Sequence, residues 1–127
     1  MSNPICWFEI YVQDMSRAKK FYEAVFQVKL APLPNPDPKA LAGMEMWAFP
    51  SSMNTYGSSG TLVHMPGCPS GGSTIVYFAC DNCAIEAARA ANSGGKIFKM
   101  KMPIGEHGFI ALVYDTEGNI IGLHSQK

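Results

Sequence analysis

Hydrophobic and polar positions along the chain follow two periods, and these periods predict strands and helices in a fixed order. Residues 7–12 alternate between two kinds of side chain, which is the period of a β-strand. Residues 18–26 carry apolar side chains at helical spacing, and Asp14 precedes them as a candidate N-cap. The first half therefore begins with a strand and an amphipathic helix. The same criteria predict two further strands, at residues 44–49 and 61–65.

Prolines interrupt this pattern once. Residues 31–39 contain prolines at alternate positions, from Pro32 to Pro38. Because proline lacks a backbone donor, this segment suits neither a helix nor a central strand. We expect a surface excursion there, and a turn-rich connection at residues 51–60.

The second half repeats the same order of elements. Residues 74–80 predict a strand, and residues 84–91 predict a helix that Gly94 and Gly95 terminate. The segment 115–119 predicts a hairpin turn with a glycine at its tight position. The strands predicted after the helix are residues 96–100, 109–114 and 120–124.

The two halves align with each other in two places. One alignment pairs residues 12–14 with 79–81, and another pairs residues 62–64 with 122–124. A single half would leave one face of its sheet uncovered. The tandem repeat therefore favours a fold in which the two halves pack against each other. The predicted fold class is α+β, one domain of residues 1–127 built from tandem βαβββ modules, module one at about 4–66 and module two at about 72–126.

Composition excludes several classes of partner. The 127 residues are 47% hydrophobic, which is enough for one buried core. Basic and acidic residues balance at ten each, so the charge expected of a nucleic-acid or anionic-membrane binder is missing. We expect no apolar run long enough to span a bilayer, and the first residues lack a signal pattern. A soluble, cytoplasmic protein is the expectation.

Four cysteines, Cys6, Cys68, Cys80 and Cys83, are expected to be free thiols in a reducing compartment. Cys80 and Cys83 form a C-x-x-C motif. Redox chemistry would need an electropositive setting, but this motif contains the acidic residue Asp81. The remaining cysteines and histidines are scattered singly, which disfavours structural zinc.

The repeat resembles the vicinal oxygen chelate superfamily, which contains glyoxalases, extradiol dioxygenases and bleomycin-resistance proteins. The residues that carry the resemblance are Val12-x-Asp14 leading into Phe21-Tyr22, Gly94-Gly95, and Asp115-x-x-Gly118-Asn119 before Leu123. The resemblance implies that both modules curl one mixed sheet into a cup, the glyoxalase/bleomycin-resistance fold. It also implies a homodimer, and metal ligands on the first and last strands of each module.

Carried onto this sequence, those ligand positions fall at Trp7, Leu62, Thr74 and Gly122. A divalent ion needs several nitrogen or oxygen donors that converge, and these residues do not supply them. The resemblance therefore implies a cup without the usual metal or other cofactor, as in the bleomycin-resistance branch.

The residues around Trp7 supply candidate chemistry. Strand alternation places Glu9 and Tyr11 on the face of Trp7. Trp7, Tyr11 and Trp47 offer flat surface to an apolar or aromatic ligand, or they fill the core. Burial between aromatics would raise the pKa of Glu9 and suit it to act as a general base; a structural hydrogen bond is the alternative.

Histidines and one threonine complete the candidate ligand-binding set. His64 and His124 occupy matched strand ends, as ligand contacts or as solvated rim residues. His107 lies in a loop before a strand, and loops often carry function. Thr74 joins the set as the module-two counterpart of Trp7.

Three functional hypotheses stay open. The first is a metal-independent protein that binds a small organic molecule. The second is a lyase or isomerase resembling lactoylglutathione lyase, with Glu9 as general base and a histidine that assists or holds a noncanonical metal. The third is a non-catalytic regulatory module.

Overall fold

The computed structural model describes residues 3–68 and 74–127, and the chain divides into two compact units. The first unit is Trp7–Thr74. The second unit combines Met1–Cys6 with Ile75–Lys127. The predicted start of module two, near residue 72, lies outside the described residues.

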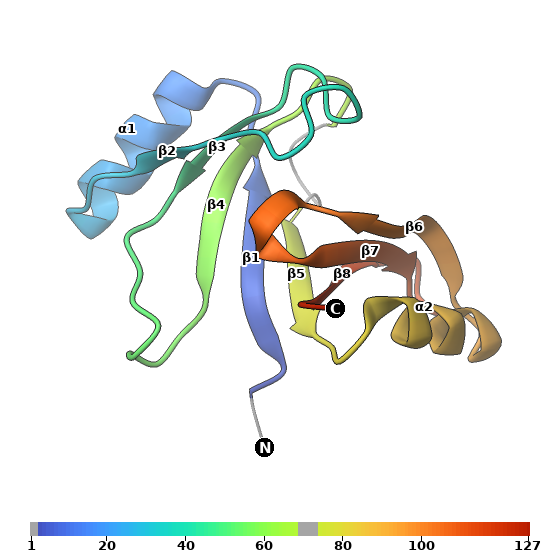
Figure 1. Cartoon of the computed structure of the whole chain (residues 1–127). Helices are drawn as coiled ribbons and strands as arrows, with labels where there is room; N and C mark the ends of the chain where they lie inside the picture. Colours follow the sequence, from blue (N-terminus) through green and yellow to red (C-terminus); the bar gives the residue numbers. More distant parts are fainter. Residues whose placement is uncertain (1–2, 69–73) are drawn as a thin grey trace. The chain divides into compact units, whose positions relative to one another are not determined.

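The first unit contains one helix and a four-stranded mixed sheet in the order β2-β3-β4-β1 (Figure 1). β1 pairs with β4 in parallel, whereas β3 is antiparallel to both β4 and β2. The elements are β1 (Ile5–Tyr11), of which the residues from Trp7 onward belong to this unit, α1 (Met15–Phe26), β2 (Ala31–Leu33), β3 (Glu45–Ala48) and β4 (Ser59–His64).

Apolar side chains fix α1 to one face of this sheet. The buried cluster consists of Val12, which follows β1, Met15 of α1, Leu30, which precedes β2, and Leu62 of β4. Leu62 is completely buried. Burying a leucine side chain contributes roughly 1.5–3 kcal/mol, so this cluster determines which sheet face α1 covers.

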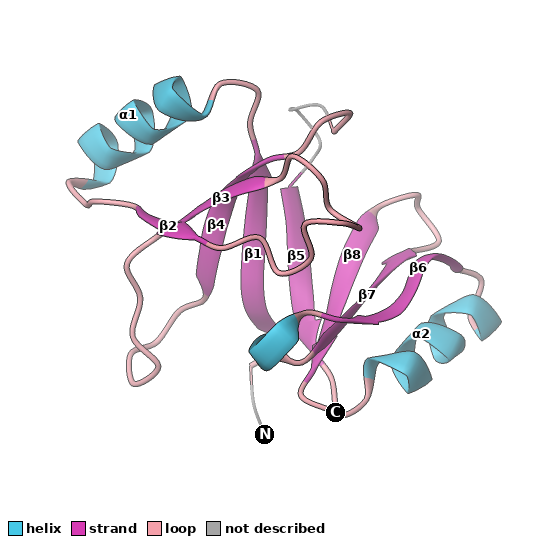
Figure 2. Ribbon diagram, turned by 45° about the horizontal axis from the view of Figure 1, so that its top comes forward, coloured by secondary structure: helices cyan, strands magenta, loops and turns pink. Residues whose placement is uncertain are grey.

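The second unit repeats the arrangement with a sheet in the order β5-β8-β7-β6. β5 is parallel to β8, and β7 is antiparallel to both β8 and β6. α2 packs on this sheet (Figure 2) through Cys83 and Ala87, which meet Ala111, Val113 and Leu123. The elements are β5 (Thr74–Ala79), α2 (Cys83–Asn92), β6 (Lys96–Pro103), the short 3₁₀ helix η1 (Gly105–His107), β7 (Phe109–Tyr114) and β8 (Ile120–Ser125).

These elements confirm the predicted α+β class and the βαβββ order of each module. The proline-rich segment differs in one respect, because its first residues form the short strand β2. Pro32 is tolerated there because β2 is the outer strand of its sheet. Neither described helix is long and apolar enough to span a bilayer.

The internal alignment of the two halves is wrong by one residue. α1 is capped by Asp14, whose Oδ1 accepts from the backbone N–H of Arg17 at 3.1 Å. The cap of α2 is Asn82, whose Oδ1 accepts from the N–H of Ala84 at 3.2 Å. Asp14 therefore corresponds to Asn82, not to Asp81.

The final strands show the same one-residue shift. Leu62 packs under α1, and its equivalent under α2 is Leu123, not Gly122. His64 therefore corresponds to Ser125, and the proposed pairing of His64 with His124 is wrong. In a strand, a shift by one residue moves every side chain to the opposite face.

The caps provide a test of this register. We expect Asn82→Ala to lower the free energy of unfolding by about 1 kcal/mol, because the N–H of Ala84 loses its acceptor. Asp81→Ala is the matched control and should change it by less than about 0.5 kcal/mol. Urea denaturation of both variants measures the difference; a larger loss for Asp81→Ala would contradict the assignment.

Candidate functional site

Three polar or aromatic side chains of β1 form a hydrogen-bonded row on the sheet face away from α1. The phenol of Tyr11 donates to Oε1 of Glu9 at 2.9 Å. The indole Nε1 of Trp7 donates toward Oε2 of the same carboxylate at 3.4 Å. Residues two apart on a strand share a face, so all three point the same way. As predicted, β1 brings Trp7, Glu9 and Tyr11 together.

The phenol of Tyr11 is strongly perturbed by this environment. Burial is the largest cause that raises the pKa of Tyr11, followed by the negative charge of Glu9 and the hydrogen bond to it. The nearby thiol of Cys68 adds to the increase. Tyr11 is therefore a persistent hydrogen-bond donor that holds the Glu9 carboxylate in place.

Thr61 of β4 lies beside this row and was not predicted from the sequence. Thr61 is the Cα partner of Glu9 in the parallel β1–β4 pairing, so both side chains lie on the same face. It is completely buried, and its Oγ1 has no hydrogen-bond partner within the described part of the chain. Burying a hydroxyl without a partner costs about 1–3 kcal/mol.

A sequence signal for Thr61 did exist. An aliphatic residue such as Leu62 is better explained as core than as a metal ligand, and the neighbouring residue then lies on the other face.

Trp47 does not join this row, which corrects the expectation that it shares the face of Trp7 and Tyr11. Its Cα partner is Leu62, and it packs against the cluster under α1. The ammonium of Lys19 lies 3.2 Å from the centroid of its ring, and Nε1 donates to Glu45 at 2.9 Å. Trp47 is thus held in a structural contact with α1.

His64 also lies apart from Glu9. It is the Cα partner of Glu45 and shares the strand face of Leu62, because the two positions are two residues apart. The structure therefore places His64 on the face that α1 covers, rather than beside the carboxylate of Glu9.

The second unit brings two of its predicted residues, His107 and His124, together. The ring Nε2 of His124 lies 2.6 Å from the carbonyl oxygen of His107. The side chain of His107 is 60% exposed and lies 3.9 Å from Glu106. Thr74 is exposed at the start of β5. The contact of His124 with a backbone carbonyl fixes η1 against β8.

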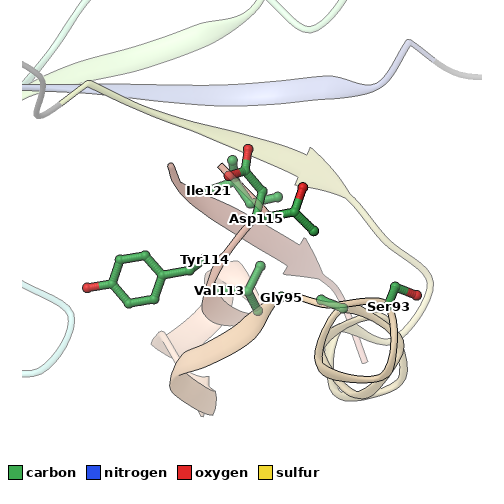
Figure 3. A pocket seen from close by; sticks show the side chains of 8 residues that line it. Ser93, Gly95, Val113, Tyr114, Asp115 and Ile121 are labelled. Carbon is green, nitrogen blue, oxygen red and sulfur yellow. The ribbon is translucent and has the colours of Figure 1, made fainter. Parts of the chain in front are cut away.

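A small cavity of about 210 Å³ lies in the second unit between the end of α2 and the turn after β7 (Figure 3). It is below the roughly 300 Å³ at which drug-sized ligand sites begin. Its one carboxylate, Asp115, accepts hydrogen bonds from the backbone of Glu117 and Asn119, and those from Asn119 keep the pKa of Asp115 low. Figure 3 shows the ring of Tyr114 directed away from the other labelled side chains. The structure of the turn after β7 therefore accounts for this cavity.

Comparisons with solved structures establish the fold. A hypothetical protein from Bacillus halodurans is 13% identical, with a TM-score of 0.72 over 100% of this chain and 96% of that one. A methylmalonyl-CoA epimerase variant from Streptomyces coelicolor is 13% identical, with a TM-score of 0.70 over 98% of each chain. The epimerase from Mycobacterium tuberculosis is 12% identical, with a TM-score of 0.68 over 98% of this chain and 88% of that one. No protein-family model and no curated relative matches the sequence.

The chain has the vicinal oxygen chelate fold. Similarity at this level of identity establishes the fold alone, and the site has to be argued from its own residues.

The corrected register changes the positions at which a vicinal oxygen chelate fold would carry metal ligands. Thr61 replaces Leu62, and Ile75 replaces Thr74, while Trp7 and Gly122 remain. These side chains offer one hydroxyl among them, which does not fit a divalent ion. Within either unit, the described residues contain no group of three His, Cys, Asp or Glu side chains that would suit a metal.

The C-x-x-C thiols do not form a reactive centre. Burial and the charge of Glu86 raise the pKa of Cys80 to about 11, so this thiol is protonated at neutral pH. Cys83 is completely buried under α2.

The coupling of Tyr11 to Glu9 predicts a pH dependence. A raised pKa means that the folded state keeps the Tyr11 proton after the unfolded chain has lost it, so the free energy of unfolding should fall as pH rises above about 10. Glu9→Gln should lower the pKa of Tyr11, because the carboxylate charge is removed while burial remains. Phenolate absorbance during alkaline titration measures this.

Two variants assign the titration. Tyr11→Phe should remove the component that appears at the highest pH, whereas Tyr56→Phe, at a fully exposed site, should leave that component in place. If the phenolate absorbance of Tyr11 rose at the same pH in Glu9→Gln as in the unmodified protein, the charge coupling between Glu9 and Tyr11 would be refuted.

Proposed function

We propose that this protein binds a small organic molecule on the β1 face formed by Trp7, Glu9 and Tyr11, without the usual metal of the superfamily. The observation that supports this is the carboxylate of Glu9, held between an indole and a phenol donor. The rings of Trp7 and Tyr11 supply apolar contact area, and the carboxylate fixes the orientation of the ligand. Ligand sites typically combine these two elements.

The arrangement is organised before any ligand arrives. Tyr11 and Trp7 fix both carboxylate oxygens of Glu9. The Glu9 side chain therefore loses little conformational entropy when a ligand binds. Thr61 adds a buried hydroxyl on the same face. The histidines assigned from the sequence as ligand contacts, His64, His107 and His124, are not needed in this proposal.

A second candidate function is isomerisation with Glu9 as general base. Two of the compared structures are methylmalonyl-CoA epimerases, and inversion of a carbon centre requires a base that takes up a proton and a donor that returns one. Glu9 would take the proton from a carbon acid and, in its protonated form, return it to the resulting carbanion, while Tyr11 would hold the carboxyl group in place. A non-catalytic regulatory module is the third outcome, and a homodimer in the cytoplasm remains part of the proposal.

Tryptophan emission tests the binding proposal directly, because the chain has two tryptophans. In Trp47→Phe the emission comes from Trp7, and we expect it to change on addition of benzylamine, benzyl alcohol or benzoate, three probes with one aromatic body. In the matched control Trp7→Phe, the emission of Trp47 should stay constant. Constant emission in both variants with all three probes would refute the binding face.

Deuterium incorporation into methylmalonyl-CoA tests the isomerase candidate. If Glu9 is the base, Glu9→Gln should slow exchange by about a hundredfold or more. Glu45→Gln is the matched control, because Glu45 accepts from Trp47 two residues along its own strand, as Glu9 does from Trp7. Equal rates for Glu9→Gln and the unmodified protein would remove Glu9 as the base.

A further inference from the structure

The cavity of the second unit lies where α2 ends, and small side chains on that helix create it. The side of α2 that faces its own sheet carries Cys83, Ala87 and Ala90 at helical spacing. At the last turn, the methyl group of Ala90 is too short to fill the space between the helix and strands β7 and β8. The cavity of about 210 Å³ occupies this space.

Two neighbouring residues cannot fill the cavity either. Gly95 lines it, but a Cβ atom at this position would lie 2.5 Å from the carbonyl oxygen of Tyr114, so only glycine fits. The ring of Tyr114 points away from the other labelled side chains (Figure 3) and packs edge-on against Phe98, with the ring centroids 5.4 Å apart. The local packing therefore keeps the cavity open.

The inner walls of the cavity are aliphatic. Val113 of β7 and Ile121 of β8 are Cα partners in an antiparallel pair, so their side chains lie on one face of the sheet. Ala90 faces them from α2, and all three belong to the apolar cluster under this helix. A hydrocarbon group placed here is stabilised because it and the walls both leave water.

The volume limits the size of the occupant. An apolar cavity of about 150 Å³ is large enough to hold benzene, and drug-sized sites begin at roughly 300 Å³. The cavity at the end of α2 lies between these values. Its occupant is therefore a molecule with a single ring or a short hydrocarbon chain.

Charges of both signs near the cavity favour a neutral occupant. Hydrogen bonds from Asn119 keep the pKa of Asp115 low, so this carboxylate stays charged and repels an anion. Arg89 in the last turn of α2 and Lys96 at the start of β6 are exposed basic residues, each next in sequence to a lining residue. They oppose the entry of a cation.

We propose that this cavity binds a small neutral molecule, whose hydrocarbon part lies against Ala90, Val113 and Ile121 and whose polar end faces the hydroxyls of Ser93 and Thr116. Hydroxyl groups both donate and accept hydrogen bonds, so they suit an uncharged polar end. All lining residues belong to the second unit. This site therefore does not depend on the binding proposed for the β1 face.

Nuclear magnetic resonance with benzyl alcohol tests the site in the full chain. We expect the backbone amide signals of Gly95, Val113 and Ile121 to shift together, with a dissociation constant on the order of 1 mM for a probe of this size. Benzoate and benzylamine have the same ring but carry a charge. Each should bind at this site at least about fivefold more weakly.

Filling the cavity from α2 provides the matched pair of variants. Ala90→Leu should weaken the binding of benzyl alcohol at least tenfold, while the melting temperature stays equal or rises, because the added side chain occupies the cavity. Ala88→Leu, the same change at an exposed position of the same helix, should leave the affinity unchanged. Ala90→Met, whose unbranched side chain adapts to irregular space, should reproduce the loss if Ala90→Leu does not fold.

Several results would overturn this site. Equal affinity for benzyl alcohol in the unmodified protein and in a folded variant of Ala90 would do so, and so would an equal loss in Ala88→Leu. Shifts confined to the amides of Trp7 and Glu9 would support the β1 face and exclude this cavity. Tighter binding of benzoate or benzylamine than of benzyl alcohol at Gly95 and Val113 would contradict the neutral ligand.

Discussion

The parallel pairing of β1 with β4 is the constraint on which the site depends. It sets Glu9 beside Thr61 and Ile10 beside Leu62. Because neighbouring positions on a strand face opposite sides, one set of partners is apolar and packs under α1, and the other set is polar. The burial of Leu62 under α1 thus holds the carboxylate and the hydroxyl on the opposite face. Any shift of this register would bury the carboxylate under the helix, at a cost of several kcal/mol.

A carboxylate between two aromatic side chains is retained because its neighbours donate to it. The phenol and the indole each provide one donor, and the phenol in turn becomes harder to ionise because the carboxylate is charged. The interaction is mutual: burial and then the charge of Glu9 raise the pKa of Tyr11, and the protonated Tyr11 keeps Glu9 oriented. On the other face, Trp47 donates to Glu45 in a similar contact, and the ammonium of Lys19 lies over the ring of Trp47.

The sequence predicted the elements well, because amphipathic periods and proline or glycine positions report local structure. It predicted the row Trp7, Glu9 and Tyr11 for the same reason, since one strand carries all three. It failed where pairing between strands decides the outcome. Asp81 and Asn82 are both good caps by residue type, and only the packing of Cys83 under β8 selects Asn82. That one-residue choice propagates along β5 and misplaces Thr74.

Trp47 and His64 were misplaced by a related error. Their faces follow from the antiparallel β3–β4 register, which the intervening loop does not encode in any local pattern. Once Leu62 is recognised as core, both residues are assigned to the side of α1, and Thr61 to the side of Glu9. At 12–13% identity the comparison with the epimerases shows the fold alone, so the chemistry of this chain has to come from the side chains that its own register brings together. On the β1 face these are a carboxylate, two aromatic rings and a buried hydroxyl, a set with too few converging donors for a divalent metal ion.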